Sequence, residues 1–505
     1  MSSHSTKRAY LLALALLTVP AAAAATPSTP PAVLDAALPG AVAAEEEGVP
    51  TRPHWVLGQS LTAAGAALLD ALDGAWRHGL NPADYATAHI HAALGRGDMA
   101  AAQDLLDAAF LRYAGDLAGG RGYEPATPDT LLRAAAWSPV PEDFVATLGP
   151  AQEGYRRLLA AHEALTAAAA AGGWPEVPDG PSLRLGDAGA GVDAVRRRLA
   201  ASGDLAPPQE AVAAGESFDA ALDDAVRRFQ ARHGLTADGV VGPATRRAMA
   251  VSAATRAHQA AINLERLRAS PPLPDSTGLR VEVNVAAFDL AVRRDADTLM
   301  RLRVVVGHPD TGTPVMRDAI ETVVFNPHWY VPRSIAMNEL LPRERANPGV
   351  LAREGFEVVA DGSPPRLRQK PGPGNALGRI KFSFPNSDAI YLHDTNAPQV
   401  FNASQRAVSH GCVRVEQPAT LAALLLEATG TAPPETVAER LKGRQSNGLR
   451  LRTPVPIDIA YRTAWVEPDG TLNFRPDVYD LDESVATKLA APRHPLAVGP
   501  LIALD

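Results

Sequence analysis

A cysteine and two histidines in the C-terminal half of the chain have residue types and spacings suited to nucleophilic catalysis. Cys412, the only cysteine among 505 residues, follows His410 by two positions, and His393 ends a β-rich run upstream. A free thiol has a pKa of about 8.5, so a cysteine nucleophile needs a base that takes its proton at neutral pH. We therefore expect the fold to bring His393 to Cys412, whereas His410 shares a face with Cys412 only if the segment between them is extended.

Other roles for Cys412 are open at this point. His393, His410 and Cys412 could hold zinc with a water in the fourth position, but neither Cys-x-x-Cys nor His-Glu-x-x-His accompanies them. Redox chemistry lacks a second cysteine as a resolving partner, and a free cysteine is often a buried, inert hydrophobe. We predict a catalytic thiol that needs neither a metal nor another cofactor.

The N-terminus has the pattern of a secretory signal peptide over residues 1–25. Lys7 and Arg8 precede an apolar run over 9–19, which a string of small residues follows. An uncleaved N-terminal anchor is the alternative. The run is about half as long as a bilayer-spanning helix, so we expect no transmembrane helix in the mature chain. Export also bears on Cys412, because a lone cysteine cannot form an intramolecular disulfide and is either buried or reactive.

Length and charge bound the organisation of the chain. The length predicts about three domains, and the formal charge of -8 gives no electrostatic reason to bind nucleic acid or an anionic membrane. We expect an α+β multidomain protein. Its expected parts are a signal peptide (1–25), a linker (26–57), a helical scaffold (58–178), a three-helix module (179–252), a connecting helix of the scaffold (253–278), a mostly β sandwich or barrel domain (279–465) with a capping insertion at about 334–375, and a C-terminal extension (466–505).

Hydrophobic periodicity separates the helical parts from the β domain. Apolar positions recur at helical spacing through the scaffold and the small module, where Pro243 opens the last helix. From residue 279 the pattern alternates, and turn residues between the β-rich runs predict an antiparallel sandwich or barrel. The insertion contains helix-forming residues at 336–341, and its length favours a functional lid over disorder. The β-rich runs lie at 281–285, 302–306, 322–325, 389–392 and 457–461.

Motifs in two of these parts resemble known families. The run F-Q-A-R-H-G-L-T-A-D-G-V-V-G-P-A-T, from Phe229 to Thr245, resembles the peptidoglycan-binding-like domain; a bundle kept only for packing is the alternative. Tyr391-Leu392-His393-Asp394-Thr395, followed by Ser409-His410-Gly411-Cys412-Val413-Arg414, resembles the signature of the YkuD-type L,D-transpeptidase catalytic domain. The combination of scaffold, module and capping loop is similar to that of the large periplasmic L,D-transpeptidases.

The second resemblance implies a cysteine acyltransferase that acts on peptidoglycan stem peptides in the periplasm. Cys412 would displace the terminal D-Ala and form a thioester, which an amine of a second stem would resolve into a 3→3 cross-link. His393 is implied as the base and acid, and His410 as a group that orients the site or assists the oxyanion. Backbone N–H groups around Gly411 and Cys412 could hold the developing oxyanion, with Ser409 as a supporting residue.

Neighbouring residues have expected supporting roles. Arg414 suits a substrate carboxylate, or else forms an ion pair with Glu416. Asp394 points to the opposite face from His393, so we expect a backbone carbonyl to orient the imidazole and Asp394 to be supporting or structural. The candidates for lining the cleft, with burial in the core as their alternative, are Trp329, Tyr330 and Tyr391.

Two further functions stay open. An L,D-carboxypeptidase would use the same residues to deliver water and trim tetrapeptide stems, and a non-catalytic wall-binding scaffold would keep the thiol inert. A lid that excludes water favours transfer to an amine. The expected partners are stem peptides as donor and acceptor, together with cell-wall synthesis enzymes, and no nucleic acid.

Overall fold

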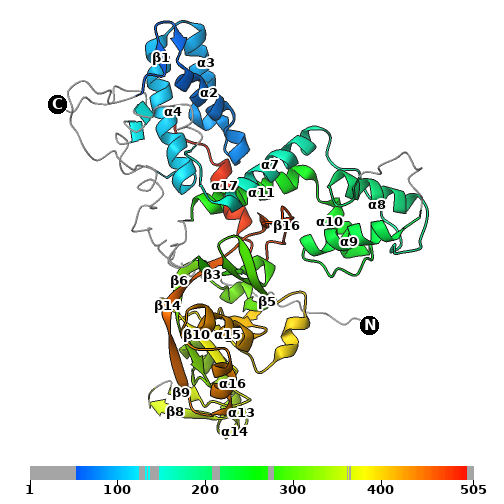
Figure 1. The fold of residues 1–505 in the computed structure, drawn as a ribbon, viewed down its shortest axis with the longest axis vertical. Helices are drawn as coiled ribbons and strands as arrows, with labels where there is room; N and C mark the ends of the chain where they lie inside the picture. The colour runs from blue at the N-terminus through cyan, green and yellow to red at the C-terminus, as the bar shows by residue number, and fades with distance from the viewer. Residues whose placement is uncertain are drawn as a thin grey trace, which may run out of the picture.

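The described chain forms three lobes that meet around a central group of helices (Figure 1). The structure, a computed structural model, describes residues 53–496 apart from 124–130, 133–134, 137–146, 207–216, 271–277, 361 and 363–364. The predicted signal peptide and nearly all of the predicted linker lie outside these residues. None of the described helices is long and apolar enough to cross a membrane.

The first lobe is the helical scaffold, which packs around a core that includes Trp55, Leu68 and Phe110. Trp55 is fully buried and its Nε1 donates a hydrogen bond to Asp107. The scaffold therefore begins before the expected boundary at residue 58. Its elements are β1 (Val56–Leu57), β2 (Ser60–Leu61), α2 (Ala63–Asp73), η1 (Ala75–His78), η2 (Pro82–Tyr85), α3 (Thr87–Gly95), α4 (Met99–Gly119) and α7 (Glu153–Ala170).

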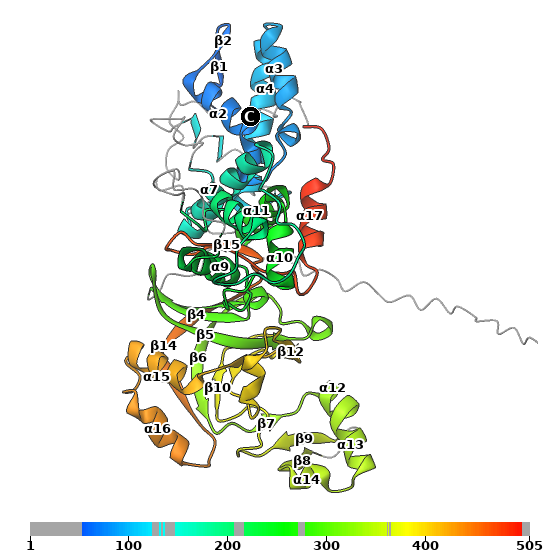
Figure 2. The same ribbon diagram turned by 90° about the vertical axis from the view of Figure 1, so that its right-hand side faces the viewer.

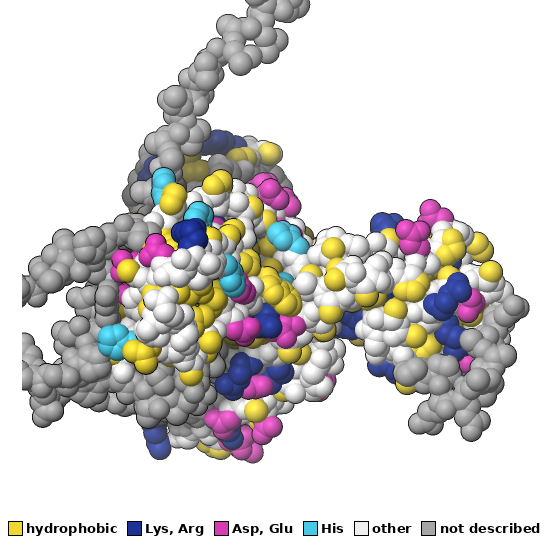
Figure 3. All heavy atoms as spheres, turned by 90° about the horizontal axis from the view of Figure 1, so that it is seen from above, with side chains coloured by type: hydrophobic (Ala, Val, Ile, Leu, Met, Phe, Trp, Pro, Cys, Tyr) yellow, Lys and Arg dark blue, Asp and Glu magenta, His cyan; other side chains and the backbone are white. Residues whose placement is uncertain are grey.

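The second lobe contains α8 (Ala190–Ala201), α9 (Ala220–Arg232) and α10 (Pro243–Ala250). The side-chain amide of Gln230, on α9, donates to Asp238 and Thr245 and accepts from the backbone N–H of Gly239, so it fixes the turn that begins α10. Figure 3 shows this lobe projecting at the right of the molecule, with acidic and basic side chains mixed on its surface. Arg196 and Asp219 form one such pair at 2.9 Å.

The lobes meet at α11 (Ala253–Arg268), α17 (Asp482–Ala490) and the hairpin of β15 (Ala464–Val466) and β16 (Leu472–Phe474). Phe474 packs in one core cluster with Tyr155 of α7 and Leu264 of α11. The C-terminal extension therefore folds back onto the scaffold.

The third lobe is a β domain built on a closed mixed sheet. The strand order is β12-β5-β13-β11-β10-β6-β14-β3-β4, and β4 also pairs with β5, which closes the ring. Its elements are β3 (Leu279–Asn284), η3 (Val285–Ala287), β4 (Asp289–Arg294), β5 (Asp297–Gly307), η4 (Pro309–Thr311), β6 (Met316–Phe325), β10 (Ile380–Ser383), β11 (Leu392–His393), η6 (Pro398–Asn402), β12 (Ala407–Ser409), β13 (Val413–Val415), α15 (Pro418–Ala428), α16 (Glu435–Lys442) and β14 (Asn447–Ala460).

Alternation within the strands fills the inside of this sheet with apolar side chains. In β3, Leu279, Val281 and Val283 are buried while the residues between them are partly exposed. Leu421 and Leu425 of α15 are fully buried in the same core. Side chains on the inner face exclude water, so the chemistry of this domain has to be located on the outer face or at the strand ends.

Two strand expectations were wrong in part. The sheet is not purely antiparallel, because β11 pairs with β13, β12 with β5, and β14 with β3 in parallel. The run at 389–392 is a strand only at its end, since Ala389 adopts a left-handed conformation (φ 55°) in a turn that the Asn386 side chain holds by accepting from the backbone N–H of Ile390.

The insertion forms a small subdomain with its own sheet, of order β7-β9-β8, and its own apolar core around Leu340, Leu351 and Phe356. Figure 2 shows this subdomain projecting from the side of the main sheet. Its helical piece at 336–340 is a π-helix. The elements are β7 (Trp329–Tyr330), α12 (Arg333–Ile335), η5 (Ala336–Leu340), α13 (Leu341–Ala346), α14 (Val350–Arg353), β8 (Phe356–Ala360) and β9 (Arg366–Gln369).

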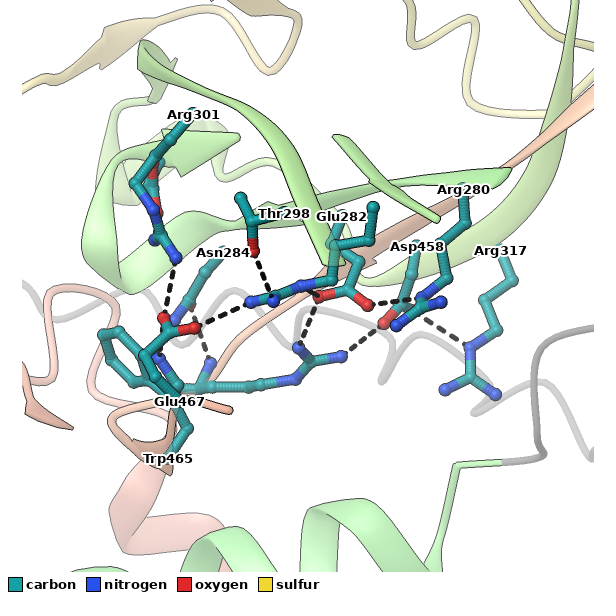
Figure 4. Close-up of polar contacts among 12 residues, drawn as sticks. Arg280, Glu282, Asn284, Thr298, Arg301, Arg317, Asp458, Trp465 and Glu467 are labelled. Carbon is teal, nitrogen blue, oxygen red and sulfur yellow. Dashed lines mark hydrogen bonds and ion pairs between the residues drawn. The ribbon is translucent and has the colours of Figure 1, made fainter. Parts of the chain in front are cut away.

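A network of ion pairs joins the β domain to the β15–β16 hairpin (Figure 4). Glu467 accepts hydrogen bonds from Arg293 (2.8 Å), Arg301 (2.9 Å) and the indole of Trp465 (2.8 Å). Burial raises the pKa of Glu467, but these hydrogen bonds and the arginine charges outweigh burial and lower the pKa to about 2. The carboxylate of Glu467 thus holds strands of the β domain against the hairpin.

We predict that Glu467→Gln destabilises the junction by about 1–3 kcal/mol at pH 7, because hydrogen bonds to a charged group are lost. Because the pKa of Glu467 is lower in the folded than in the unfolded state, its carboxylate stabilises the fold above about pH 4.5. This stabilisation is lost as the pH falls toward 2. Thermal unfolding followed from pH 7 to 3 should therefore show a shallower decline for Glu467→Gln than for wild type. The exposed pair of Glu321 with Arg450 offers Glu321→Gln as a control with little effect, and parallel curves for all three proteins would contradict the prediction.

Candidate active site

Strand pairing gathers a set of polar side chains on one face of β10, β11 and β13. Lys381 lies opposite His393 in the antiparallel pair β10–β11, and His393 lies opposite Arg414 in the parallel pair β11–β13. Paired residues share a face, and so do residues two apart on one strand. Tyr391 and Cys412 therefore join the same face, while Phe382, Leu392 and Val413 point into the apolar core.

This register makes His393 and Cys412 diagonal neighbours. The strand spacing and a two-residue offset place their Cα atoms about 8 Å apart, a gap that two inward-leaning side chains can bridge. His393 is 5 % exposed, and its Nδ1 is buried with no hydrogen-bond partner among the described residues. An orphaned ring nitrogen is unusual in a protein interior, and here it belongs to the face that carries the thiol.

The imidazole of His393 is held neutral. Burial and the positive charge of Arg414 lower its pKa to about 3, and Lys381 adds to this. Hydrogen bonding to the backbone of Asp394 and Leu377 acts in the opposite direction. These backbone contacts fit the expectation that main-chain groups orient the ring, and the neutral ring can accept a proton.

Cys412 packs against the core of the β domain while its side chain stays partly accessible. Burial raises the pKa of its thiol, whereas hydrogen bonds from the backbone and hydroxyl of Tyr391 and the charges of Lys381 and Arg414 lower it. The net effect is a raised pKa, and the Sγ lies 3.9 Å from the carbonyl oxygen of Ala389. The resting site therefore combines a neutral thiol with a neutral imidazole.

Lys381 is a site residue that the sequence did not reveal. Its Nζ lies 3.9 Å from the centre of the Tyr391 ring, and its charge acts on both Cys412 and His393. Alternation of Ile380, Lys381 and Phe382 indicates an outward-facing lysine on a strand, but only the long-range pairing of β10 with β11 brings it to the thiol. Tyr391, expected only as a cleft residue, lies beside Cys412.

We predict that Lys381→Met slows alkylation of Cys412 by iodoacetamide at neutral pH by about threefold to tenfold, because loss of the cation raises the thiol pKa. Lys370→Met, which removes an exposed lysine that pairs with Glu357 in the insertion, should alkylate at the wild-type rate. Equal rates for Lys381→Met and wild type would show that the Lys381 charge does not reach the sulfur.

The turn that carries Cys412 is fixed by hydrogen bonds on both sides. The Ser409 hydroxyl donates to the carbonyl of Cys412 (2.6 Å) and accepts from the N–H of Gly411 (3.2 Å). The Thr313 hydroxyl donates to the carbonyl of Gly411 (2.7 Å). Gly411 has a φ of 109°, a conformation that side-chain-bearing residues rarely adopt, so the turn requires glycine there. The N–H of Gly411 already donates its hydrogen bond to Ser409 in this structure.

Tyr479, in the C-terminal extension, supports this turn from behind. Its hydroxyl donates to the carbonyl of Gly307 (2.6 Å) and accepts from the backbone N–H of Thr313 (3.2 Å). Gly307 N–H in turn donates to the Thr313 hydroxyl (2.9 Å). The position of the nucleophile thus depends on a segment outside the expected catalytic domain.

We predict that Tyr479→Phe lowers the free energy of unfolding by about 1–2 kcal/mol, since a buried donor and acceptor lose their partner. We also expect the acylation rate of Cys412 to fall about tenfold, because a displaced nucleophile loses its attack geometry. Denaturant unfolding and stopped-flow acylation measure the two effects. A variant with full activity would show that the Thr313 contact alone holds the turn.

His410 lies at a bend after β12, and its side chain contacts the insertion. The residues 410–412 cross from one side of β5 to the other, and the exposed ring of His410 places Nε2 2.7 Å from Oε1 of Glu339 in the π-helix of the insertion. The contact links the nucleophile turn to the insertion. Glu339 was not a sequence candidate, since 71 positions separate it from His410 and no local pattern relates them.

The ion pair between Arg414 and Glu416, considered as the alternative to binding a substrate carboxylate, was wrong. Glu416 pairs with Arg303 of β5, not with Arg414. Arg414 has no ion-pair partner among the described residues, and its Nε is buried without a hydrogen-bond partner there. Burial lowers its pKa, and Cys412 raises it. The guanidinium therefore remains available for a carboxylate on the face that carries the thiol.

The remaining candidates have structural or peripheral positions. The Asp394 carboxylate accepts hydrogen bonds from the backbone N–H groups of Arg379 (2.7 Å) and Thr395 (2.7 Å), so it ties together the ends of β10 and β11. Trp329 packs against the core of the insertion and also hydrogen bonds with the Tyr391 side chain. Tyr330 is 64 % exposed and contacts Arg368.

The described side chains of this region do not assemble into a set of metal ligands. Across the described residues, no group of three or more His, Cys, Asp or Glu side chains lies close enough to hold a metal ion. His393, His410 and Cys412 therefore do not form the zinc site considered from sequence. The site instead contains the Cys412 thiol, the buried neutral imidazole of His393, the cations Lys381 and Arg414, and a turn fixed by hydrogen bonds. This arrangement is suited to acyl transfer.

Three parts of the chain match models of known protein families. Residues 278–457 match the L,D-transpeptidase catalytic domain, residues 188–249 the "Putative peptidoglycan binding domain", and residues 50–161 the scaffold domain. The chain is 35% identical over 243 residues to the "Putative L,D-transpeptidase" of Haemophilus influenzae, a match that covers 45% of this chain and 48% of the relative. The chain thus spans about half the length of that relative.

Shorter and weaker similarities were also found. An 80-residue stretch is 46% identical to the N-acetylmuramoyl-L-alanine amidase CwlM of Mycobacterium tuberculosis, covering 15% of this chain and 20% of the amidase. Among solved structures, an L,D-transpeptidase from Stackebrandtia nassauensis aligns with a TM-score of 0.23 and 14% identity over 57% of this chain and 98% of its own. One from Mycobacterium smegmatis aligns with a TM-score of 0.19 and 13% identity over 36% and 59%.

Proposed function

We propose that this chain, whose residues 278–457 belong to the L,D-transpeptidase catalytic domain family, cross-links peptidoglycan stem peptides through a thioester on Cys412. The observation that carries the proposal is the shared face of Cys412 and His393, with a partly accessible thiol and an orphaned Nδ1. The proposal places the reaction in the periplasm, where its substrate lies.

In the first half-reaction, His393 takes the thiol proton and the thiolate attacks the carbonyl carbon that precedes the terminal D-Ala of a donor stem. Lys381 and Arg414 suit the carboxylates of that donor, because both are cations that flank the sulfur. Collapse of the tetrahedral intermediate breaks the amide bond, and His393 returns the proton to the departing amine. The products are free D-Ala and a thioester on Cys412.

In the second half-reaction, an amine of another stem attacks the thioester and the sulfur leaves as thiol. Water attacking instead would make the chain an L,D-carboxypeptidase. The insertion supports transfer, since it contacts the nucleophile turn through Glu339 and can restrict water there. The peptidoglycan binding module supports a substrate in the wall.

Incubating purified protein with tetrapeptide muropeptides and separating the products by mass spectrometry tests the proposal. We expect D-Ala release together with dimers whose link joins two third residues. Trimmed tripeptide monomers without dimers would establish hydrolysis in place of transfer. No D-Ala release from protein that binds sacculi would leave wall binding as the function.

A further inference from the structure

Two imidazoles lie near Cys412, and they differ in their access to a second substrate. His393 is 5 % exposed within the sheet, while the side chain of His410 is 50% exposed on the turn beside the nucleophile. The acceptor of a transpeptidase arrives after the donor already occupies the site. A base that serves the acceptor must therefore be reached from solvent, which His410 allows and His393 does not.

Contact with Glu339 determines which nitrogen of His410 is free. Nε2 of His410 lies 2.7 Å from Oε1 of Glu339. A carboxylate only accepts hydrogen bonds, so in the neutral form of the imidazole Nε2 carries the hydrogen and Nδ1 keeps its lone pair. A carboxylate that holds an imidazole in one tautomer and stabilises its protonated form is the arrangement by which histidine acts as a general base.

The acceptor requires such a base. An alkylamine has a pKa of about 10.4 and is an ammonium ion at neutral pH, so it must lose a proton before it can attack a thioester. Lys381 and Arg414, which flank the sulfur, repel an ammonium ion, while Glu339 attracts one. The charges thus divide the site into a cationic part that suits donor carboxylates and an anionic edge that suits the acceptor amine.

We infer that His410 and Glu339 form an acceptor-activating dyad, in which His410 is the base for the incoming amine and Glu339 is a positioning residue acting through it. The inference rests on the proposed function, because it requires a thioester on Cys412. His410 Nδ1 takes one proton from the ammonium ion. The neutral amine then attacks the thioester carbon, the C–S bond breaks as the C–N bond forms, and the second amine proton passes to the leaving sulfur.

The insertion carries Glu339, so the dyad exists only while the insertion lies against the nucleophile turn. Glu339 belongs to a π-helix, a local distortion that is frequent at functional sites. Contact between the insertion and the turn thereby favours transfer to an amine over hydrolysis. This role goes beyond exclusion of water, because it depends on the carboxylate itself.

The test compares Glu339→Gln with Glu354→Gln, which removes a carboxylate from an exposed ion pair with Arg343 elsewhere in the insertion. Intact-mass measurement first gives the rate at which a tetrapeptide donor acylates Cys412. The acyl-enzyme is then resolved with either lysine amide acetylated on its α-amine, whose one remaining amine is an ammonium ion at pH 7, or methoxyamine, which is neutral at that pH. Only the ammonium acceptor needs a base before attack.

We expect Glu339→Gln to acylate within about twofold of wild type, to lose about tenfold or more of its rate with lysine amide, and to keep its rate with methoxyamine. Glu354→Gln should match wild type throughout, and His410→Gln acyl-enzyme should lose more of its rate with lysine amide than with methoxyamine. An unchanged rate with lysine amide, or an equal loss with both amines, would overturn the dyad while leaving the proposed function intact. Absence of a thioester in the wild type would overturn the proposed function itself, and the dyad with it.

Discussion

Cys412→Ala protein is expected to release no D-Ala and to form no cross-linked dimers, with a loss of more than about 10⁴-fold in turnover. Cys412 is the only cysteine in the chain, so no second thiol can replace it. The fold should survive the change, because the side chain is small and sits at the edge of the core. Muropeptide analysis of wild type and variant measures the loss.

Two controls separate chemistry from folding in this variant. Its thermal unfolding should match that of wild type within a few degrees, and any binding of sacculi by the lobe of α8, α9 and α10 should persist because that lobe is separate. Dimers formed by Cys412→Ala at a substantial fraction of the wild-type rate would show that the nucleophile is another group.

His393→Gln should lower the acylation rate by about 10²-fold to 10⁴-fold, the range over which a general base contributes. Glutamine keeps a polar side chain of similar size in the buried site but cannot take the thiol proton. Because Lys381 and Arg414 remain to bind the donor, KM should change far less than kcat. Single-turnover acylation at saturating donor measures the step directly.

The pH dependence of kcat/KM gives a second signature of His393. With its pKa lowered to about 3, the imidazole stays neutral down to mild acid, so its capacity to accept a proton is not lost between pH 7 and 5. A histidine with the ordinary pKa of about 6.5 would instead reduce kcat/KM about 30-fold at pH 5. An acid limb centred near pH 6.5 in wild type would therefore contradict the buried environment assigned to His393.

The sequence was sufficient to predict Cys412 as a nucleophile with His393 as its base, and their shared face of the sheet follows from strand periodicity. Tyr391 directly precedes β11 and is two residues from His393, and Cys412 directly precedes β13 and is two residues from Arg414. Local spacing does not tell which strands pair, however. The chain between β11 and β13 first crosses to the far side of β5 as β12, and this detour makes β11 and β13 parallel.

Residues that reach the site from distant elements were the ones missed. Lys381 comes from β10 and Glu339 from the insertion, and neither has a motif that relates it to the thiol. The Arg414–Glu416 pair was reasonable from spacing, since residues two apart share a face. The Glu416 carboxylate instead pairs with Arg303 on the neighbouring strand. Long-range pairings of this kind depend on sheet register, which a single sequence leaves open.

Tyr479 shows a further limit of prediction from sequence, because it supports the nucleophile turn indirectly. The C-terminal extension follows the last expected strand and has no catalytic pattern, yet its hydroxyl supports Gly307 and Thr313. The same extension closes the hairpin that packs on the scaffold. Catalytic geometry and domain assembly thus share one segment, so that loosening the junction should also disturb the site.

The most direct measurement is the mass of the intermediate after rapid quenching of wild-type protein with a tetrapeptide donor. We expect an adduct equal to the donor without its terminal D-Ala, mapped to the tryptic peptide that contains Cys412 and reduced in yield in His393→Gln. A protein that forms dimers while Cys412 stays unmodified, or that carries the adduct on another residue, would contradict the account.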